Sequence, residues 1–336
     1  MSIDLESFLA ARGYRMMRPN ALEGAALAEF NSCLDQFREW AEAHAAFRNP
    51  EIKVVTVFLN SSEANAFAFT EADVIGVNWG LIVKIRELLG QVFDPMNFSW
   101  IPEDRRAAAK EWLYESAKFF FFWHEMGHIW NGHTRLAKTA GLAAIDELGA
   151  TSMGSLSSKD FQTLEMDADS FGATQICSMA RRFPFPVKNS ILENEQGDGA
   201  TSLAMLAFSS YLVFSMFGRE MRLEEQESWD HPSAPLRQLA ITGTISTKAV
   251  QMGWFNIDQA SYLTQIGTQV AEDAYRSAFK EDPVSEDLAE TFNPAFSSEG
   301  ANYLSGLLEH WKLLRPVLDQ LKPGGVLPAV QDFADG

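Results

Sequence analysis

One segment constrains the fold of this chain more than any other. The run from Arg105 to Trp130 has a helical composition, and around Phe119–Trp123 it is apolar on every side. A helix that is apolar all round has no face for water, so it must lie inside a core. The chain can build such a core, because 46% of its 336 residues are hydrophobic and 12% are aromatic. We therefore expect a folded protein arranged around one buried helix.

Upstream of this helix the pattern is mixed. A first helix is predicted from Ala21 to Ala46, with Asn20 as its N-cap and Glu23 completing a capping box. β-branched residues with partial alternation predict strands within Ile52–Asn60 and Ala66–Gly80. Together these segments predict a small mixed sheet beside the buried helix.

Downstream, the chain has mostly helical patterns. Helices are expected over Asp160–Arg182, Thr201–Glu225, a stretch after Pro235, and Asn302–Leu321. The predicted fold class is therefore α+β and mainly helical. We divide the chain into an N-terminal helical segment (1–50), an α+β core (51–185), a helical lobe (186–280), and a C-terminal helix with a flexible tail (281–336).

Composition and charge exclude some classes of function. Subtracting 45 acidic from 27 basic residues gives a net charge of −18, which repels a phosphate backbone, so nucleic acid is not an expected partner. Cys33 and Cys177 form no C-x-x-C pair, and residues 1–6 are acidic where a signal peptide would be basic, so we expect a cytoplasmic protein. The apolar run Thr201–Gly218 is interrupted by Ser209, Ser210 and Ser215 and is shorter than a membrane span of about 20 residues, so we expect a buried helix there and no membrane insertion.

The buried helix carries the pattern H-E-x-x-H. Positions i and i+4 lie on one helical face, so His124 and His128 can direct an imidazole nitrogen at the same metal ion. Glu125 emerges about 100° further round the helix, where it can hold a water on the metal without being a ligand. Such a water is the nucleophile of metal-assisted hydrolysis, and the glutamate is its general base. A pair of core histidines is the alternative interpretation of this pattern alone.

A catalytic zinc ion needs a third protein ligand. The metzincin pattern would require glycine and histidine where this chain has Asn131 and Thr134, so that class is disfavoured. The next predicted helix offers Glu165 and Asp169, again four residues apart on one face. Glu165 can complete a His₂Glu zinc site, while Asp169 can accept a hydrogen bond from the outer nitrogen of a ligand histidine and fix its tautomer.

With these motifs in order, the chain resembles the gluzincin metallopeptidases, and most closely the family of the heat-shock protease HtpX and the CAAX prenyl protease. The resemblance covers roughly Val54 to Ala240 and rests on five motifs: Asn65-Ala66-Phe67-Ala68, Gly80-Leu81, His124–His133, Glu165–Asp169, and His231-Pro232 followed by Arg237. It implies a zincin-like catalytic core over residues 51–185, completed by the helical lobe.

The resemblance also implies roles for residues outside the H-E-x-x-H helix. His231 would donate a hydrogen bond to the oxyanion of the tetrahedral intermediate, and Arg237 would hold the neighbouring loop or a carboxylate near it. The segment Asn65, Ala66, Phe67 and Ala68 would be an exposed edge strand on which an extended peptide substrate lies. His133 is expected at a helix end, paired with a backbone carbonyl, and His44 and His310 are expected to be surface or packing residues.

The sequence therefore favours a soluble, Zn²⁺-dependent endopeptidase that acts on a protein or peptide substrate. Members of the resembled family usually carry clear transmembrane helices, which this chain lacks in sequence. The chain is accordingly compared with a soluble group as an alternative, the phage-exclusion peptidase Lit and its relatives, which it also resembles. Two other functions stay open: a catalytically inactive binding or regulatory protein with a metallopeptidase fold, and a membrane-associated protease.

Overall fold

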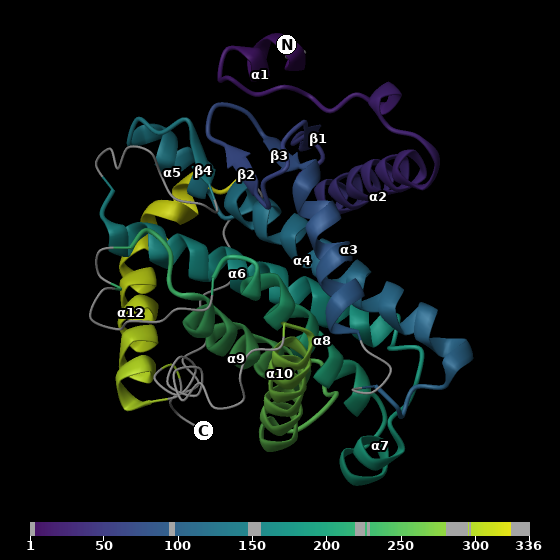
Figure 1. Ribbon diagram of the computed structural model, residues 1–336. Coiled ribbons are helices and arrows are strands. Elements are labelled where there is room, and N and C mark those ends of the chain that lie inside the picture. Colours follow the sequence, from purple (N-terminus) through teal and green to yellow (C-terminus); the bar gives the residue numbers. More distant parts are fainter. Residues whose placement is uncertain are drawn as a thin grey trace.

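Helix α4 (Arg106–Trp130) runs through the middle of the fold, with the small sheet and the N-terminal helix α2 (Gly24–Arg48) on one side and α6 (Ser158–Arg182), further along the chain, on the other (Figure 1). Every residue of α4 from Ser116 to Trp130 is buried, which confirms the prediction drawn from its apolar composition. The computed structural model describes residues 4–93, 98–146, 156–218, 226, 229–279, 295 and 297–323. Within them the protein is mainly helical and has one mixed sheet.

That sheet contains four strands in the described part of the chain: β1 (Val55–Leu59), β2 (Ala66–Phe69), β3 (Val74–Asn78) and β4 (Ala144–Asp146). Their spatial order is β1-β3-β2-β4. Strand β3 runs parallel to β1 and antiparallel to β2, and β2 is also antiparallel to β4. The predicted mixed sheet beside the H-E-x-x-H helix is therefore present.

The position of β2 contradicts the predicted substrate-binding edge. Phe67 pairs with Gly76 on one side and with Asp146 on the other, and Ala68 is likewise paired on both sides. Ala66, Phe67 and Ala68 are at most 1% exposed, and the neighbouring Asn65 is also buried. A strand whose backbone is hydrogen-bonded to two neighbours cannot accept a peptide as a third, so this prediction was wrong. The three-residue β4 that covers the edge gave no signal in the sequence.

The N-terminal helix begins later than predicted. Helix α2 spans Gly24–Arg48, and Glu23 precedes it in an extended conformation without a side-chain cap. Asn20 instead lies in a short 3₁₀ helix, Pro19–Ala21. The predicted capping box is therefore absent, because the chain turns at Pro19 and extends again at Leu22 before α2 starts. At the other end, α2 runs to Arg48, two residues beyond the predicted end at Ala46.

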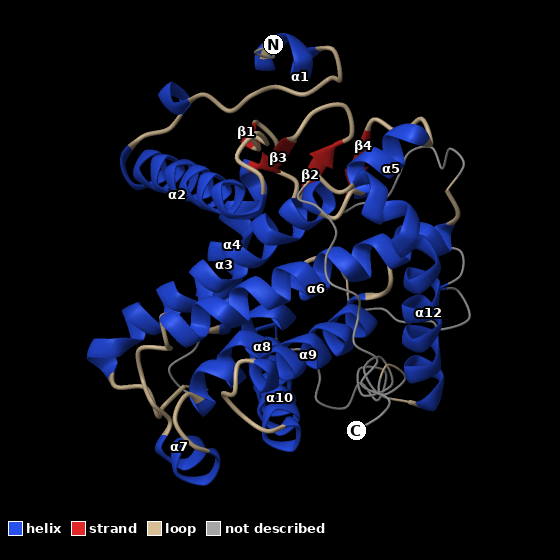
Figure 2. Cartoon of the chain, turned by 180° about the vertical axis from the view of Figure 1, so that it is seen from behind, coloured by secondary structure: helices blue, strands red, loops and turns tan. Residues whose placement is uncertain are grey.

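The other helices surround α4 and the sheet. Helix α6 begins with a capping box formed by Ser157 and Asp160, and it lies along α4, with α9 on its far side (Figures 1 and 2). The long helices are α3 (Trp79–Val92), α6 (Ser158–Arg182), α8 (Ala200–Ser215), α9 (Ala234–Gln251), α10 (Ile257–Phe279) and α12 (Ser298–Leu321). The shorter ones are α1 (Leu5–Ala10), the 3₁₀ helix Glu103–Arg105, α5 (His133–Thr139) and α7 (Ser190–Gln196).

Helix α8 corresponds to the apolar run that could have been mistaken for a membrane span. It is buried from Ala200 to Phe214 and packs against α4, α9 and α10. The hydroxyl group of Ser209 donates to a backbone carbonyl of α4. The hydroxyl group of Ser210 lies within hydrogen-bond distance of a backbone carbonyl of α8 and of the side-chain oxygen of Gln238 in α9. No helix in the described part of the chain is long and apolar enough to cross a bilayer.

Some predictions fall on residues that are not described. These are the part of the predicted helix Thr201–Glu225 after residue 218, and the tail beyond residue 323. The division of the chain into four parts stays a prediction.

Candidate metal centre

Two glycines allow α4 and α6 to approach closely at the site. A Cβ atom on Gly127 of α4 would lie 3.2 Å from the Cα of Ala168, and one on Gly172 of α6 would lie 3.2 Å from the carbonyl oxygen of Phe120. Both distances are tighter than ordinary packing contacts. The short interhelical separation places the side chains of one helix directly against those of the other.

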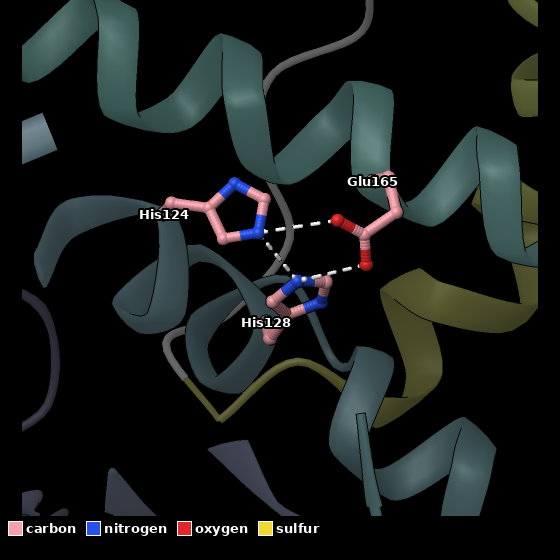
Figure 3. A group of neighbouring side chains, drawn as sticks. All are labelled: His124, His128 and Glu165. Carbon is pink, nitrogen blue, oxygen red and sulfur yellow. Dashed lines mark hydrogen bonds and ion pairs between the residues drawn. The ribbon is translucent and has the colours of Figure 1, made fainter. Parts of the chain in front are cut away.

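At this contact, His124 and His128 of α4 face Glu165 of α6 (Figure 3). The Nε2 atoms of the two histidines lie 3.0 Å apart. The Nε2 of His124 is 3.3 Å from Oε2 of Glu165, and the Nε2 of His128 is 3.3 Å from Oε1. All three side chains are 1% exposed. The three residues predicted from two i, i+4 patterns are therefore brought together.

The arrangement fits a tetrahedral metal ion. Bonds of about 2.0–2.1 Å from zinc to nitrogen or oxygen would separate the ligand atoms by roughly 3.3 Å. The nitrogen–oxygen distances of 3.3 Å match this value, and the nitrogen–nitrogen distance of 3.0 Å is slightly shorter. Among the described residues, the buried Oε2 of Glu165 accepts no hydrogen bond. A buried carboxylate oxygen that faces two imidazole nitrogens is a suitable cation ligand.

Asp169 and Arg237 form a hydrogen-bonded pair that contacts the outer nitrogen of His124. The Nδ1 of His124 donates to Oδ1 of Asp169 at 2.9 Å, which leaves its Nε2 lone pair directed at the metal position. Arg237 of α9 donates to both oxygens of Asp169, each at 2.8 Å, and its Nη2 is 3.7 Å from Glu165. Arg237 was expected to hold either the neighbouring loop or a carboxylate near it, and in the structure it binds the carboxylate of Asp169.

Burial and the neighbouring charges shift the pKa values of the site residues in opposite directions. Burial alone would raise the pKa of Glu165, but the imidazole groups of His231, His128 and His124 around it hold that pKa well below its ordinary value. Burial lowers the pKa of His128 to about 4, although Glu165 opposes the shift. The pKa of Asp169 is likewise lowered, because Arg237 outweighs the effect of burial. Near neutral pH the centre therefore presents ionised carboxylates and a neutral His128, the protonation states that metal ligands require.

Two further predicted residues lie at the same site. The Nε2 of His231 is 3.7 Å from Oε1 of Glu165, so the loop that precedes α9 reaches the centre. That nitrogen is buried and makes no hydrogen bond to the described residues. Glu125 is buried beside His124 and is not part of the group that could hold a metal. Asn65 to Ala68 take no part in this group, because they form the interior strand described above.

His133 lies at a helix end as expected, at the start of α5, but its predicted partner was wrong. It was expected to pair with a backbone carbonyl, but its Nδ1 lies 3.1 Å from Nδ1 of His128, and its Nε2 lies 2.9 Å from Oδ2 of Asp167. Asn131 also donates to Asp167, at 2.8 Å. Asp167 is the middle acid of the Glu-Met-Asp-Ala-Asp run, so its i+2 position between Glu165 and Asp169 was a signal that the sequence contained.

The other two histidines lie away from the centre. The ring of His44 packs against Trp123 and Trp130 at centroid distances of 5.3 and 5.0 Å. His310 of α12 pairs with Asp160 at the start of α6, at 2.8 Å. His44 is therefore a packing residue, as expected, while His310 makes a specific ion pair.

Comparisons with known proteins add no family assignment. No family model, no curated protein and no solved structure matches this chain. The identification of the site therefore rests on its own geometry.

Proposed function

We propose that this protein is a zinc-dependent endopeptidase of the gluzincin type, with His124, His128 and Glu165 as the metal ligands. The observation that carries the proposal is the convergence of these three buried side chains from two helices. The alternative interpretation, a pair of core histidines, accounts poorly for Glu165, because burying a carboxylate is costly unless its charge is paired or binds a metal. The zincin-like nature of the 51–185 core is part of the same proposal.

Zinc is the metal that the donor set favours. Two imidazole nitrogens and one carboxylate form the ligand set of several catalytic zinc sites, which leave a fourth position open. Calcium and magnesium prefer sites built from oxygen atoms, and thiolates are absent from this group. A zinc ion held there would supply Lewis-acid activation of water and of a substrate carbonyl.

The surrounding side chains supply the proton transfers and the polar contacts. Glu125 would take a proton from the attacking water and deliver it to the leaving amine of the cleaved peptide bond. His231, whose Nε2 lies 3.7 Å from Oε1 of Glu165, would donate a hydrogen bond to the oxyanion. Asp169 and Arg237 hold His124 in the required orientation.

Metal analysis together with a cleavage assay tests this proposal. Purified protein loaded with Zn²⁺ is expected to bind one equivalent, to cleave unfolded casein, and to lose cleavage when a chelator removes the metal. The variant Glu165→Gln removes the anionic ligand and is expected to bind zinc much more weakly. Stoichiometric zinc without cleavage of any protein substrate would favour a non-catalytic regulatory protein. No zinc binding by the wild type would contradict the proposal.

A further inference from the structure

His128 has an outer partner that differs from the one that holds His124. The Nδ1 of His124 meets a carboxylate directly, at Asp169. The Nδ1 of His128 instead meets a second imidazole, that of His133, at 3.1 Å. His133 is the first residue of α5 and is fully buried. Water therefore has no access to replace this contact.

The proton positions along this chain of contacts follow from its far end. Oδ2 of Asp167 accepts a hydrogen bond from Nδ2 of Asn131, at 2.8 Å, and lies 2.9 Å from Nε2 of His133. An ionised carboxylate only accepts hydrogen bonds, so Nε2 of His133 carries the proton. A His128 that binds a metal through the lone pair of Nε2 carries its proton on Nδ1. That Nδ1 lies 3.1 Å from Nδ1 of His133, so His128 donates in this contact and His133 accepts.

We propose that His133 and Asp167 form a positioning relay that fixes His128 in its metal-binding tautomer, as Asp169 does directly for His124. The inference rests on the metal site proposed above. Both acids, Asp167 and Asp169, project from α6, one residue to either side of Ala168, so one helix supplies the metal ligand Glu165 and the outer support of both histidines.

The turn between α4 and α5 fixes the position of His133. Gly132 separates α4 from α5 and has a positive φ of 85°, so the chain turns between Trp130 and His133. A Cβ atom on Gly132 would lie 3.1 Å from backbone atoms of Leu318 and Leu321 in α12. The C-terminal helix therefore packs against the turn that places His133.

Zinc affinity measured by competition with a chromophoric chelator tests the relay without an activity assay. His133→Phe removes both hydrogen bonds and is expected to weaken zinc binding about 10–100-fold. His133→Asn places a carbonyl oxygen near the position of Nδ1 and is expected to restore most of the affinity. His310→Phe is the matched control, because it removes another histidine–aspartate pair on α6 and is expected to leave zinc affinity unchanged. Equal zinc affinity in wild type and His133→Phe, or no rescue by asparagine, would overturn the relay.

Nitrogen NMR of the wild-type protein labelled on histidine gives a second readout that needs no variant. In both metal-free and zinc-loaded protein, His133 is expected to be protonated at Nε2 alone and to have a bare Nδ1. A proton on Nδ1 of His133 would overturn the relay. If the wild type binds no zinc, the proposed function fails, while the nitrogen shifts of the metal-free protein still decide how His133 and His128 share their protons.

Discussion

The two sides of helix α4 place a buried histidine in different surroundings, one polar and one aromatic. Toward α6, His128 has a partner on each nitrogen and belongs to a network of carboxylates. Toward α2, His44 packs among Trp123, Trp130 and Phe171, and its Nε2 makes no hydrogen bond to the described residues. Burial lowers the pKa of both histidines to about 4. A depressed histidine pKa therefore reports burial in this protein, and only the set of partners distinguishes the candidate metal centre from the aromatic core.

The largest effect expected on the α6 side is on turnover. Glu125→Gln keeps the size and polarity of the side chain but cannot take a proton, so turnover should fall about 10²–10⁴-fold while zinc is retained. Parallel measurements of zinc content and of casein cleavage check this. A variant that keeps its activity would contradict the role of Glu125 as base, and one that loses zinc would make Glu125 a ligand.

His231 should give the next largest effect. Its hydrogen bond to the oxyanion would form mainly in the transition state, so His231→Ala should raise the barrier by roughly 2–4 kcal/mol. Because ground-state binding is little affected, kcat and kcat/KM should fall together while KM changes little. A rise in KM at unchanged kcat would instead place His231 in substrate binding.

A pair of glycine variants tests how tightly the α6 side is built. Gly172→Ala pushes a methyl group against the backbone of Phe120 and His124, so it should destabilise the fold by about 1–3 kcal/mol and weaken zinc binding. Gly243→Ala in α9 is the control, because its Cβ would meet nothing within 4 Å. That variant should gain roughly 0.5–1 kcal/mol from helix propensity alone. Denaturant unfolding and zinc titration measure both; equal stability of the two variants would mean that the helices are not held at close contact.

The smallest effect belongs to the α2 side and depends on pH. The pKa of His44 is lowered by burial and by Arg48, so protonation of His44 favours the unfolded chain. Its cost to stability is absent above the unfolded pKa of roughly 6.5 and grows as the pH falls towards about 4. His44→Phe keeps a ring in the aromatic cluster and removes this cost, so its stability relative to wild type should rise by about 1–2 kcal/mol between pH 7 and pH 4.5. A difference that does not change with pH would show that His44 is accessible to water.

Much of the helical framework could be predicted from the sequence. The buried helix ending at Trp130, the strands within 52–60 and 66–80, and the helix ending at Arg182 were all expected, because each carries a local pattern of apolar residues. The start of α2 was missed because Pro19 redirects the chain just before it. Strand β4 was missed because three residues are too few to show any period.

For the candidate site, the sequence by itself determined which side chains share a face. His124 with His128, and Glu165 with Asp169, are each four residues apart, and the geometry of an α-helix alone aligns such pairs. The tertiary structure decided what faces them. The closeness of α4 and α6, the contact of Arg237 with Asp169, the pairing of β2 on both sides, and the link from His133 to Asp167 all join segments distant in the chain. Helical periodicity is a short-range property that a sequence displays, whereas these contacts depend on how the helices and strands pack, which no local pattern records.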